Sequence, residues 1–202
     1  MLPLDGMKKK SFRRKGDNIK MGNCENFLAN CIPQIAGMPY SLYLTIQGKY
    51  FSGYTKEVKF GNGLNAWAGL FNPIESCRNL HIYVWEVSNT GQTPVRARIY
   101  FNSVPPGQGT NVSTIYQGNT TLCPPPEPCS QLCQASNVSG EPEGGVRAFV
   151  RRVLPEVTVG DEEVGKFIFP PGGSFLIFLS DPETPNEPAS ATLRFSWWEE
   201  EL

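Results

Sequence analysis

Cysteines are the residues of this chain with the clearest potential for chemistry. Five of the six fall in two segments, Cys24 and Cys31 near the N-terminus and Cys123, Cys129 and Cys133 in a proline-rich stretch. A zinc site needs short paired spacings such as Cys-x2-Cys, whereas six residues separate the first pair and five and three separate the others. Disulfides fit better, because extended segments without a core gain most from covalent anchoring. We expect no metal and treat these five as disulfide or inter-subunit candidates, with reduced structural thiols as the alternative.

Catalytic residues are hard to assemble from the rest of the sequence. His81 is the single histidine, so a base that titrates near neutral pH has one candidate. It stands between Leu80 and Ile82 in a predicted strand, where a packed histidine is the usual case. No Gly-x-Ser-x-Gly sequence offers a nucleophile, and the glycine-rich stretch 170–173 lies between two predicted strands rather than before a helix that could bind phosphate. We expect a protein that is not an enzyme and holds no cofactor.

Charge divides the chain into two parts. Residues 1–20 hold seven basic and two acidic residues, so they carry +5, and the remaining 182 residues carry −6 of a total of −1. This balance predicts a basic, cysteine-bearing arm over 1–37 ahead of an acidic domain over 38–202. The molecule as a whole lacks the excess of basic residues that is typical of nucleic-acid-binding proteins. We interpret the acidic runs 161–163 and 199–201 as solvated chain.

Membrane and export signals are weak. The longest uninterrupted apolar run, 175–179, is far below the roughly 20 residues that a spanning helix needs. The basic residues near the N-terminus are not followed by the apolar region of a secretory signal. We expect no membrane span and no recognisable signal peptide.

Alternating apolar residues predict strands from Tyr40 onward. Period-two patterns occur at 42–46, 80–85, 95–101 and 191–198, with Gly- and Pro-rich turns between them. They predict an all-β, antiparallel β-sandwich of jelly-roll type. The positions expected in its core are Leu42, Leu44, Leu80, Ile82, Val84, Ile99, Phe101, Phe175, Ile177, Leu193 and Phe195.

The opposite faces of two of these strands are aromatic. Tyr83 and Trp85 flank His81 on one strand, and Tyr100 follows two arginines on the other. Such a face needs a cover, which either the same chain or another subunit could supply, because aromatic and Arg side chains are enriched in interface cores. We therefore treat Tyr83, Trp85 and Tyr100 as interface candidates.

Residues 104–142 interrupt the strand pattern with seven prolines and three cysteines. We expect a long, stiff, exposed insertion there.

Several stretches at turns and strand ends form a recognisable set, namely WAGLFNP at 67–73, YFN at 100–102, GGVRAFVR at 144–151, GKFIFPPGGSF at 165–175 and WWE at 197–199. They resemble an uncharacterised family of small β-rich proteins from spore-forming Firmicutes. This resemblance, over about residues 40–202, implies fold and lineage rather than an activity. A cysteine-bearing arm ahead of a β-sandwich is also similar in layout to the subunits of endospore appendages. In that group, N-terminal connectors and disulfides join each jelly roll to its neighbours.

These features together predict a structural subunit that self-assembles. The arm has scattered apolar residues but too few for a core, so we expect it to become ordered only by binding to a neighbouring copy. A head-to-tail contact of this kind that does not close into a ring gives a filament. We expect a disulfide-reinforced homopolymer, an extracellular or spore-surface fibre anchored at a spore or cell surface. One alternative is a carbohydrate- or surface-binding module that stacks sugars on Trp67, Trp85, Trp197 or Trp198, and another is a phage or particle decoration protein.

Overall fold

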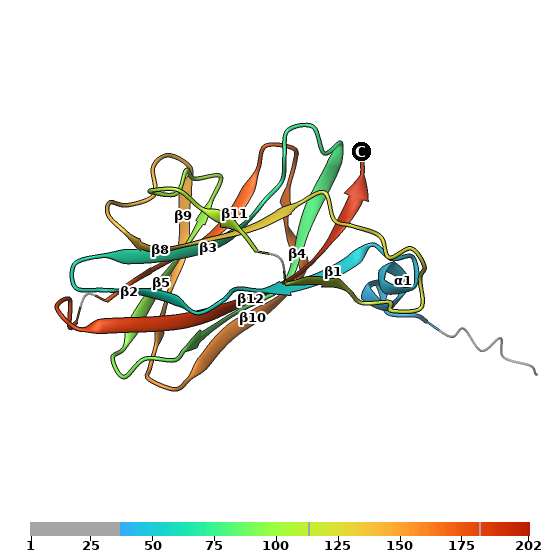
Figure 1. The fold of residues 1–202 in the computed structure, drawn as a ribbon. Coiled ribbons are helices and arrows are strands. Elements are labelled where there is room, and N and C mark those ends of the chain that lie inside the picture. The colour runs from blue at the N-terminus through green and yellow to red at the C-terminus, as the bar shows by residue number, and fades with distance from the viewer. Residues whose placement is uncertain (1–36, 113, 182) are drawn as a thin grey trace, which may run out of the picture. The chain divides into compact units, whose positions relative to one another are not determined.

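Apolar side chains from two antiparallel sheets fill the space between them (Figure 1). The computed structural model describes residues 37–112, 114–181 and 183–202. Sheet A runs in the order β10 (Thr158–Phe169), β4 (Arg78–Asn89), β12 (Pro188–Glu201), β1 (Tyr50–Tyr54) and β7 (Ile115–Gln117), and β2 (Val58–Gly61) pairs with a further part of β12. Sheet B runs in the order β6 (Thr110–Asn111), β8 (Gln131–Val138), β3 (Asn65–Phe71), β11 (Ser174–Ser180), β5 (Val95–Phe101) and β9 (Val146–Val153). The predicted all-β antiparallel sandwich is confirmed.

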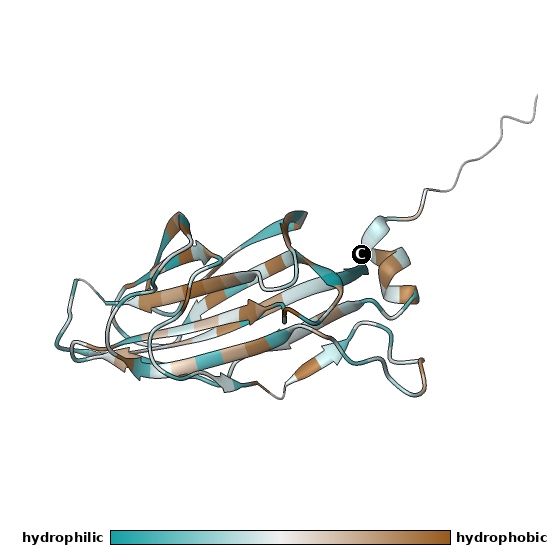
Figure 2. Ribbon diagram, turned by 90° about the horizontal axis from the view of Figure 1, so that it is seen from above, coloured by the Kyte–Doolittle hydropathy of each residue, from teal (hydrophilic) through white to brown (hydrophobic). Residues whose placement is uncertain are grey.

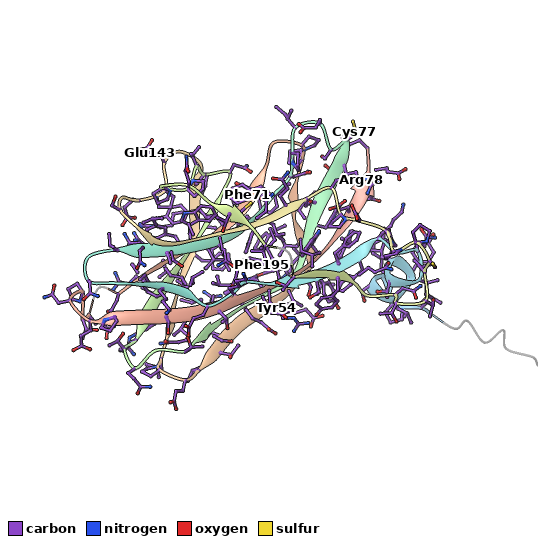
Figure 3. All side chains as sticks on the ribbon, viewed as in Figure 1. Tyr54, Phe71, Cys77, Arg78, Glu143 and Phe195 are labelled. Atoms are coloured by element: carbon purple, nitrogen blue, oxygen red, sulfur yellow. The ribbon has the colours of Figure 1, made fainter. Side chains whose placement is uncertain are left out.

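The core between the sheets follows the alternation of the long strands. Figure 2 shows apolar and polar residues succeeding one another along them, and Phe195 points into the space between the sheets (Figure 3). Most of the positions predicted for the core are buried, namely Leu44, Leu80, Ile82, Ile99, Phe175, Ile177, Leu193 and Phe195. Phe101 is partly buried and packs against this core.

The strand predicted over 42–46 is wrong, because this segment is the helix α1 (Tyr40–Ile46). Pro39 precedes it, as is common at helix starts, and its carbonyl accepts from the N–H of Tyr43 at 3.1 Å. Helical spacing buries Leu44 and leaves Leu42 47% exposed. Three alternating apolar residues in so short a segment cannot distinguish a strand from two helical turns.

The alternation predicted for β4 breaks at a β-bulge. On β12, Ser196 pairs with Val84 and Trp197 with Ile82, so Tyr83 is an extra residue on β4. Beyond the bulge the inward face shifts by one position. Trp85 is therefore buried in the core, which makes its prediction as an outward interface residue wrong, and Val84 is only partly buried.

The chain itself covers the outer face of sheet B. Tyr100 is buried there beside Phe178 and Trp67, and the Trp67 indole N–H donates to the carbonyl of Pro106 at 2.8 Å. A Cβ on Gly109 would overlap the Trp67 ring, so the backbone lies directly on it. Tyr100 is therefore covered by other residues of the same chain and not by another subunit. Tyr83 remains partly exposed on the outer face of sheet A.

The insertion predicted over 104–142 is partly ordered into the sheets. It contributes β6 and β8 to sheet B and β7 to sheet A. The expectation of one long exposed loop is therefore wrong for these strands. Residues 118–130 are the part between β7 and β8 that lies outside the strands.

Candidate functional site

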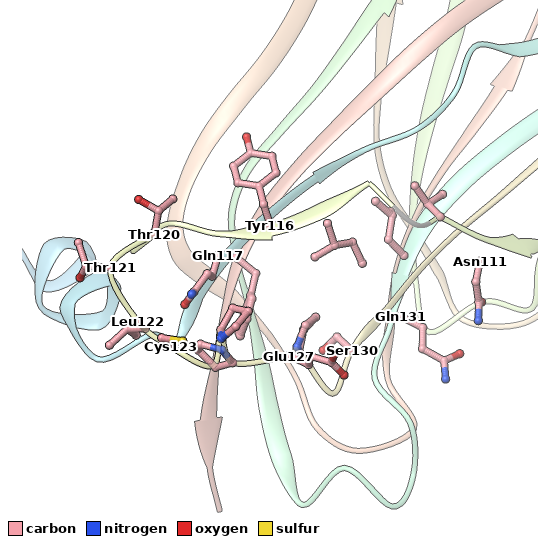
Figure 4. A pocket seen from close by; sticks show the side chains of 17 residues that line it. Asn111, Tyr116, Gln117, Thr120, Thr121, Leu122, Cys123, Glu127, Ser130 and Gln131 are labelled. Atoms are coloured by element: carbon pink, nitrogen blue, oxygen red, sulfur yellow. The ribbon is translucent and has the colours of Figure 1, made fainter.

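An apolar groove opens where β7 ends sheet A and β6 ends sheet B (Figure 4). Its volume is about 820 Å³, within the range of ligand-binding clefts. We call it the β7 groove. Strands β1, β7 and β8, the 118–130 segment and the residue after β6 supply its apolar lining, which consists of Phe51, Val112, Ile115, Leu122, Pro125, Pro126, Pro128 and Leu132.

Two buried polar side chains in the β7 groove have no hydrogen-bond partner among the described residues. Gln117 is 7% exposed, and neither its amide nitrogen nor its amide oxygen is paired. Its side chain points from β7 toward the 122–127 wall (Figure 4). Ser130 is 3% exposed and its hydroxyl is also unpaired. A buried unpaired polar group costs about 1–3 kcal/mol, so the groove offers both a donor and an acceptor to an occupant.

Strand β7 also has a free edge. The N–H of Tyr54 donates to the Thr114 carbonyl, and the N–H of Gly118 donates to the Tyr50 carbonyl. Because alternate residues of an antiparallel strand bond to the same neighbour, the backbone groups of Ile115 and Gln117 face away from β1. Among the described strands β7 pairs with β1 alone, so this edge can accept another strand.

The four described cysteines differ in solvent exposure. Cys123 is exposed and lines the β7 groove, and Cys77 is exposed just before β4 (Figure 3). Cys133 is half-buried on β8, its thiol donates to Asn111 Oδ1 at 3.1 Å, and burial raises the pKa of that thiol. Cys129 is half-buried. No disulfide joins these four residues, and Cys24 and Cys31 lie outside the described residues.

A buried carboxylate holds the groove wall in place. Glu199 is 2% exposed, and its oxygens accept from the backbone N–H groups of Cys129 at 2.9 Å and Ser130 at 2.8 Å. The Arg78 guanidinium lies 3.2 Å away and compensates the charge. The interpretation of 199–201 as solvated chain is therefore wrong at this position.

The run 161–163 has a buried member too. Glu163 is buried, accepts from the indole N–H of Trp85 at 3.2 Å, and lies 3.4 Å from the Lys166 ammonium.

The outer face of sheet A carries a packed aromatic cluster that includes His81. Trp198 stacks on His81 with ring centroids 5.1 Å apart and makes a T-shaped contact with Tyr40 on α1. His81 Nε2 lies 3.2 Å from Glu200. Burial lowers the pKa of His81, and the negative charge of Glu200 opposes that shift. His81 is therefore packed against Trp198 and lies beside one carboxylate.

The tryptophans of the sandwich are buried side chains. All four tryptophans are buried, so none is open to stack on a sugar. Within residues 37–112, 114–181 and 183–202, no group of three His, Cys, Asp or Glu side chains is arranged to hold a metal ion. In the same ranges, no helix has the length and hydropathy to cross a membrane.

Sequence reasoning named Cys123 among the residues that now line the β7 groove, but it missed Gln117, Ser130 and the anchoring Glu199. The structure separates Cys123 from the aromatic candidates Tyr83, Trp85 and Tyr100, which lie in the sheets and not in the groove lining. The spacing of Glu199 was a usable signal, because it continues the inward positions 193, 195 and 197 of β12.

The fold defines an all-β protein with two packed antiparallel sheets. The chain matches the Family of unknown function (DUF6143) over residues 28–202 and belongs to that family. No curated protein and no solved structure matched the chain. The matched region begins at residue 28, so it includes Cys31 and excludes the basic residues 8–20.

Proposed function

We propose that the chain is a structural subunit that self-assembles head to tail, the N-terminal arm of one copy being held by the sandwich of the next. The observation that carries this proposal is the edge of β7, a strand that pairs with β1 alone among the described strands, together with the apolar β7 groove beside it. Strand addition to such an edge is a common way for one chain to capture another. A contact between two different surfaces of the subunit extends into a filament unless its rotation closes a ring.

The positions of the thiols support covalent reinforcement. Cys123 presents an exposed thiol in the groove wall, close to where an arm would bind, and the arm carries Cys24 and Cys31. Each disulfide forms when two thiols give up two protons and two electrons to an oxidant such as oxidised glutathione, which leaves as two glutathione thiols. Cys133 is a weaker candidate, because its raised pKa leaves less thiolate to react.

An oxidising location suits such a subunit. We place it in an extracellular or spore-surface fibre of a spore-forming Firmicute. The support is the cysteine pattern and the likeness in layout to endospore appendage subunits.

Full-length protein, incubated with oxidised glutathione, tests this function. We expect polymers that resist denaturant until a reductant is added. The double substitution Cys24→Ser with Cys31→Ser should leave polymers that come apart in denaturant alone, whereas Cys77→Ser serves as a control that leaves resistance unchanged. Full-length protein that stays monomeric at high concentration would contradict the proposal.

A further inference from the structure

The lining of the β7 groove suits a peptide. Most of its surface is apolar, Asn111, Thr120, Thr121 and Gln131 add uncharged polar groups, and Glu127 is the one charged side chain among the residues that line it. Gln117 adds one buried N–H donor group and one buried carbonyl acceptor, which is the pattern that a peptide bond needs. The free edge of β7 offers further N–H and C=O groups beside it. An extended segment with apolar side chains would satisfy all three features.

From these observations, and resting on the self-assembly proposed above, we infer that residues 27–35 of a second copy occupy the β7 groove. This segment reads Phe-Leu-Ala-Asn-Cys-Ile-Pro-Gln-Ile, and it is the most apolar part of the arm. Its backbone extends sheet A as a strand beside β7. Pro33 has no N–H, so the pairing ends before it and the ladder involves 27–32.

The extent of the family match supports this choice of segment. The match begins at residue 28 and so takes in nearly all of 27–35, whereas it leaves out the basic residues 8–20. The apolar segment is therefore part of what the family has in common with this chain, and the basic run is not.

The choice of a second copy over the same one follows from the self-assembly proposed above, and the isotope labels in the experiment below distinguish the two.

A photo-crosslinker in the full-length chain tests this occupant. We would replace Phe27 by p-benzoylphenylalanine, co-assemble equal amounts of ¹⁴N- and ¹⁵N-labelled protein, irradiate, and map the cross-linked peptides by mass spectrometry. The expected products join position 27 of one isotopic form to residues 112–132 of the other.

A variant of the groove itself provides the second readout. Gln117→Leu keeps the approximate size of the side chain and removes the unpaired amide, so the subunit should fold at least as stably. Cross-linking into the groove should fall on the order of tenfold, because the peptide loses its buried partner. Gln108→Leu makes the same change at an exposed position outside the groove and should leave the yield unchanged.

Each other outcome has a definite meaning. Cross-links within one isotopic form alone would overturn the second copy as the occupant. Polymers whose cross-links fall outside 112–132 would overturn the groove as the acceptor and leave self-assembly standing. A protein that gives neither polymers nor cross-links would overturn both proposals.

Discussion

The backbone N–H of Ser130 donates a 2.8 Å hydrogen bond to Oε1 of Glu199, 69 positions further along the chain. This contact joins the last residue of the 118–130 segment to the inner face of β12. One wall of the β7 groove is therefore held by a buried carboxylate and not by a core of its own. Its stability should depend on that single side chain.

Loss of the Glu199 charge should loosen the groove wall and destabilise the fold. Glu199→Gln removes the charged partner of Arg78 and weakens two charge-assisted hydrogen bonds, so we expect the free energy of unfolding to fall by about 2 kcal/mol. Urea denaturation measures this change. Glu201→Gln, at a side chain that is 71% exposed, is the matched control and should change stability little. Equal effects of the two substitutions would contradict the role given to Glu199.

Gly165 lies where the register of β10 with β4 shifts, between Glu162 and Phe167, and this position should not tolerate a side chain. This residue has φ +76°, and an added Cβ would overlap the Trp198 ring. Gly63→Ala is a matched control, since Gly63 has φ +80° but open space around it. We expect both variants to lose about 1 kcal/mol from backbone strain, and Gly165→Ala to lose a further 1–3 kcal/mol from overpacking. Thermal unfolding of the two variants measures their losses of stability. Similar losses in both would show that Trp198 is not packed on Gly165.

The long strands were predictable from the sequence because their alternation depends on one property, burial of every second side chain. Positions 95–101 and 191–197 follow it, and they define the sandwich. Residues 42–46 show that a short alternation is not enough, because two turns of helix can bury one residue of three. The inward orientation of the Trp85 side chain could not be predicted from the sequence, because the bulge at Tyr83 depends on the pairing of β4 with β10 and β12.

The candidate site was less accessible to sequence reasoning than the fold. Strand β7 has three residues, too few for a periodic pattern, and the groove exists only because β7 and β6 end their sheets on the same side. The cysteines could be recognised by type and spacing, but their different exposure could not. Cys123 and Cys133 lie in the same proline-rich stretch, yet one is open and the other half-buried.

Stability should fall in mild acid because of the single histidine. Burial lowers the pKa of His81 in the folded state below its ordinary value of 6.5, so the unfolded chain binds the proton more readily. The free energy of unfolding is therefore highest above pH 6.5 and decreases as the pH falls through that value. Denaturant unfolding between pH 7.5 and pH 5.5 measures this dependence. In His81→Gln the decrease over that range should largely disappear, and a decrease that persists would assign it to other groups.

Thiol reactivity should separate the cysteines of the insertion. Cys123 is exposed, whereas Cys133 is half-buried with a raised pKa, so iodoacetamide should alkylate Cys123 at least tenfold faster at neutral pH. Peptide mapping of the native protein after brief labelling gives both rates. Alkylation in denaturant is the control and should make the two rates similar. Faster native labelling of Cys133 would contradict the structure at this site.

Assembly through the N-terminal arm is the central claim, and electron microscopy of two proteins tests it most directly. Full-length protein and a chain that begins at residue 38 would be incubated with oxidised glutathione at the same high concentration. Circular dichroism would check that both are rich in β structure. We expect filaments from the full-length chain and dispersed subunits from the shortened one. Filaments from the shortened chain, or a full-length protein that remains monomeric, would contradict the claim.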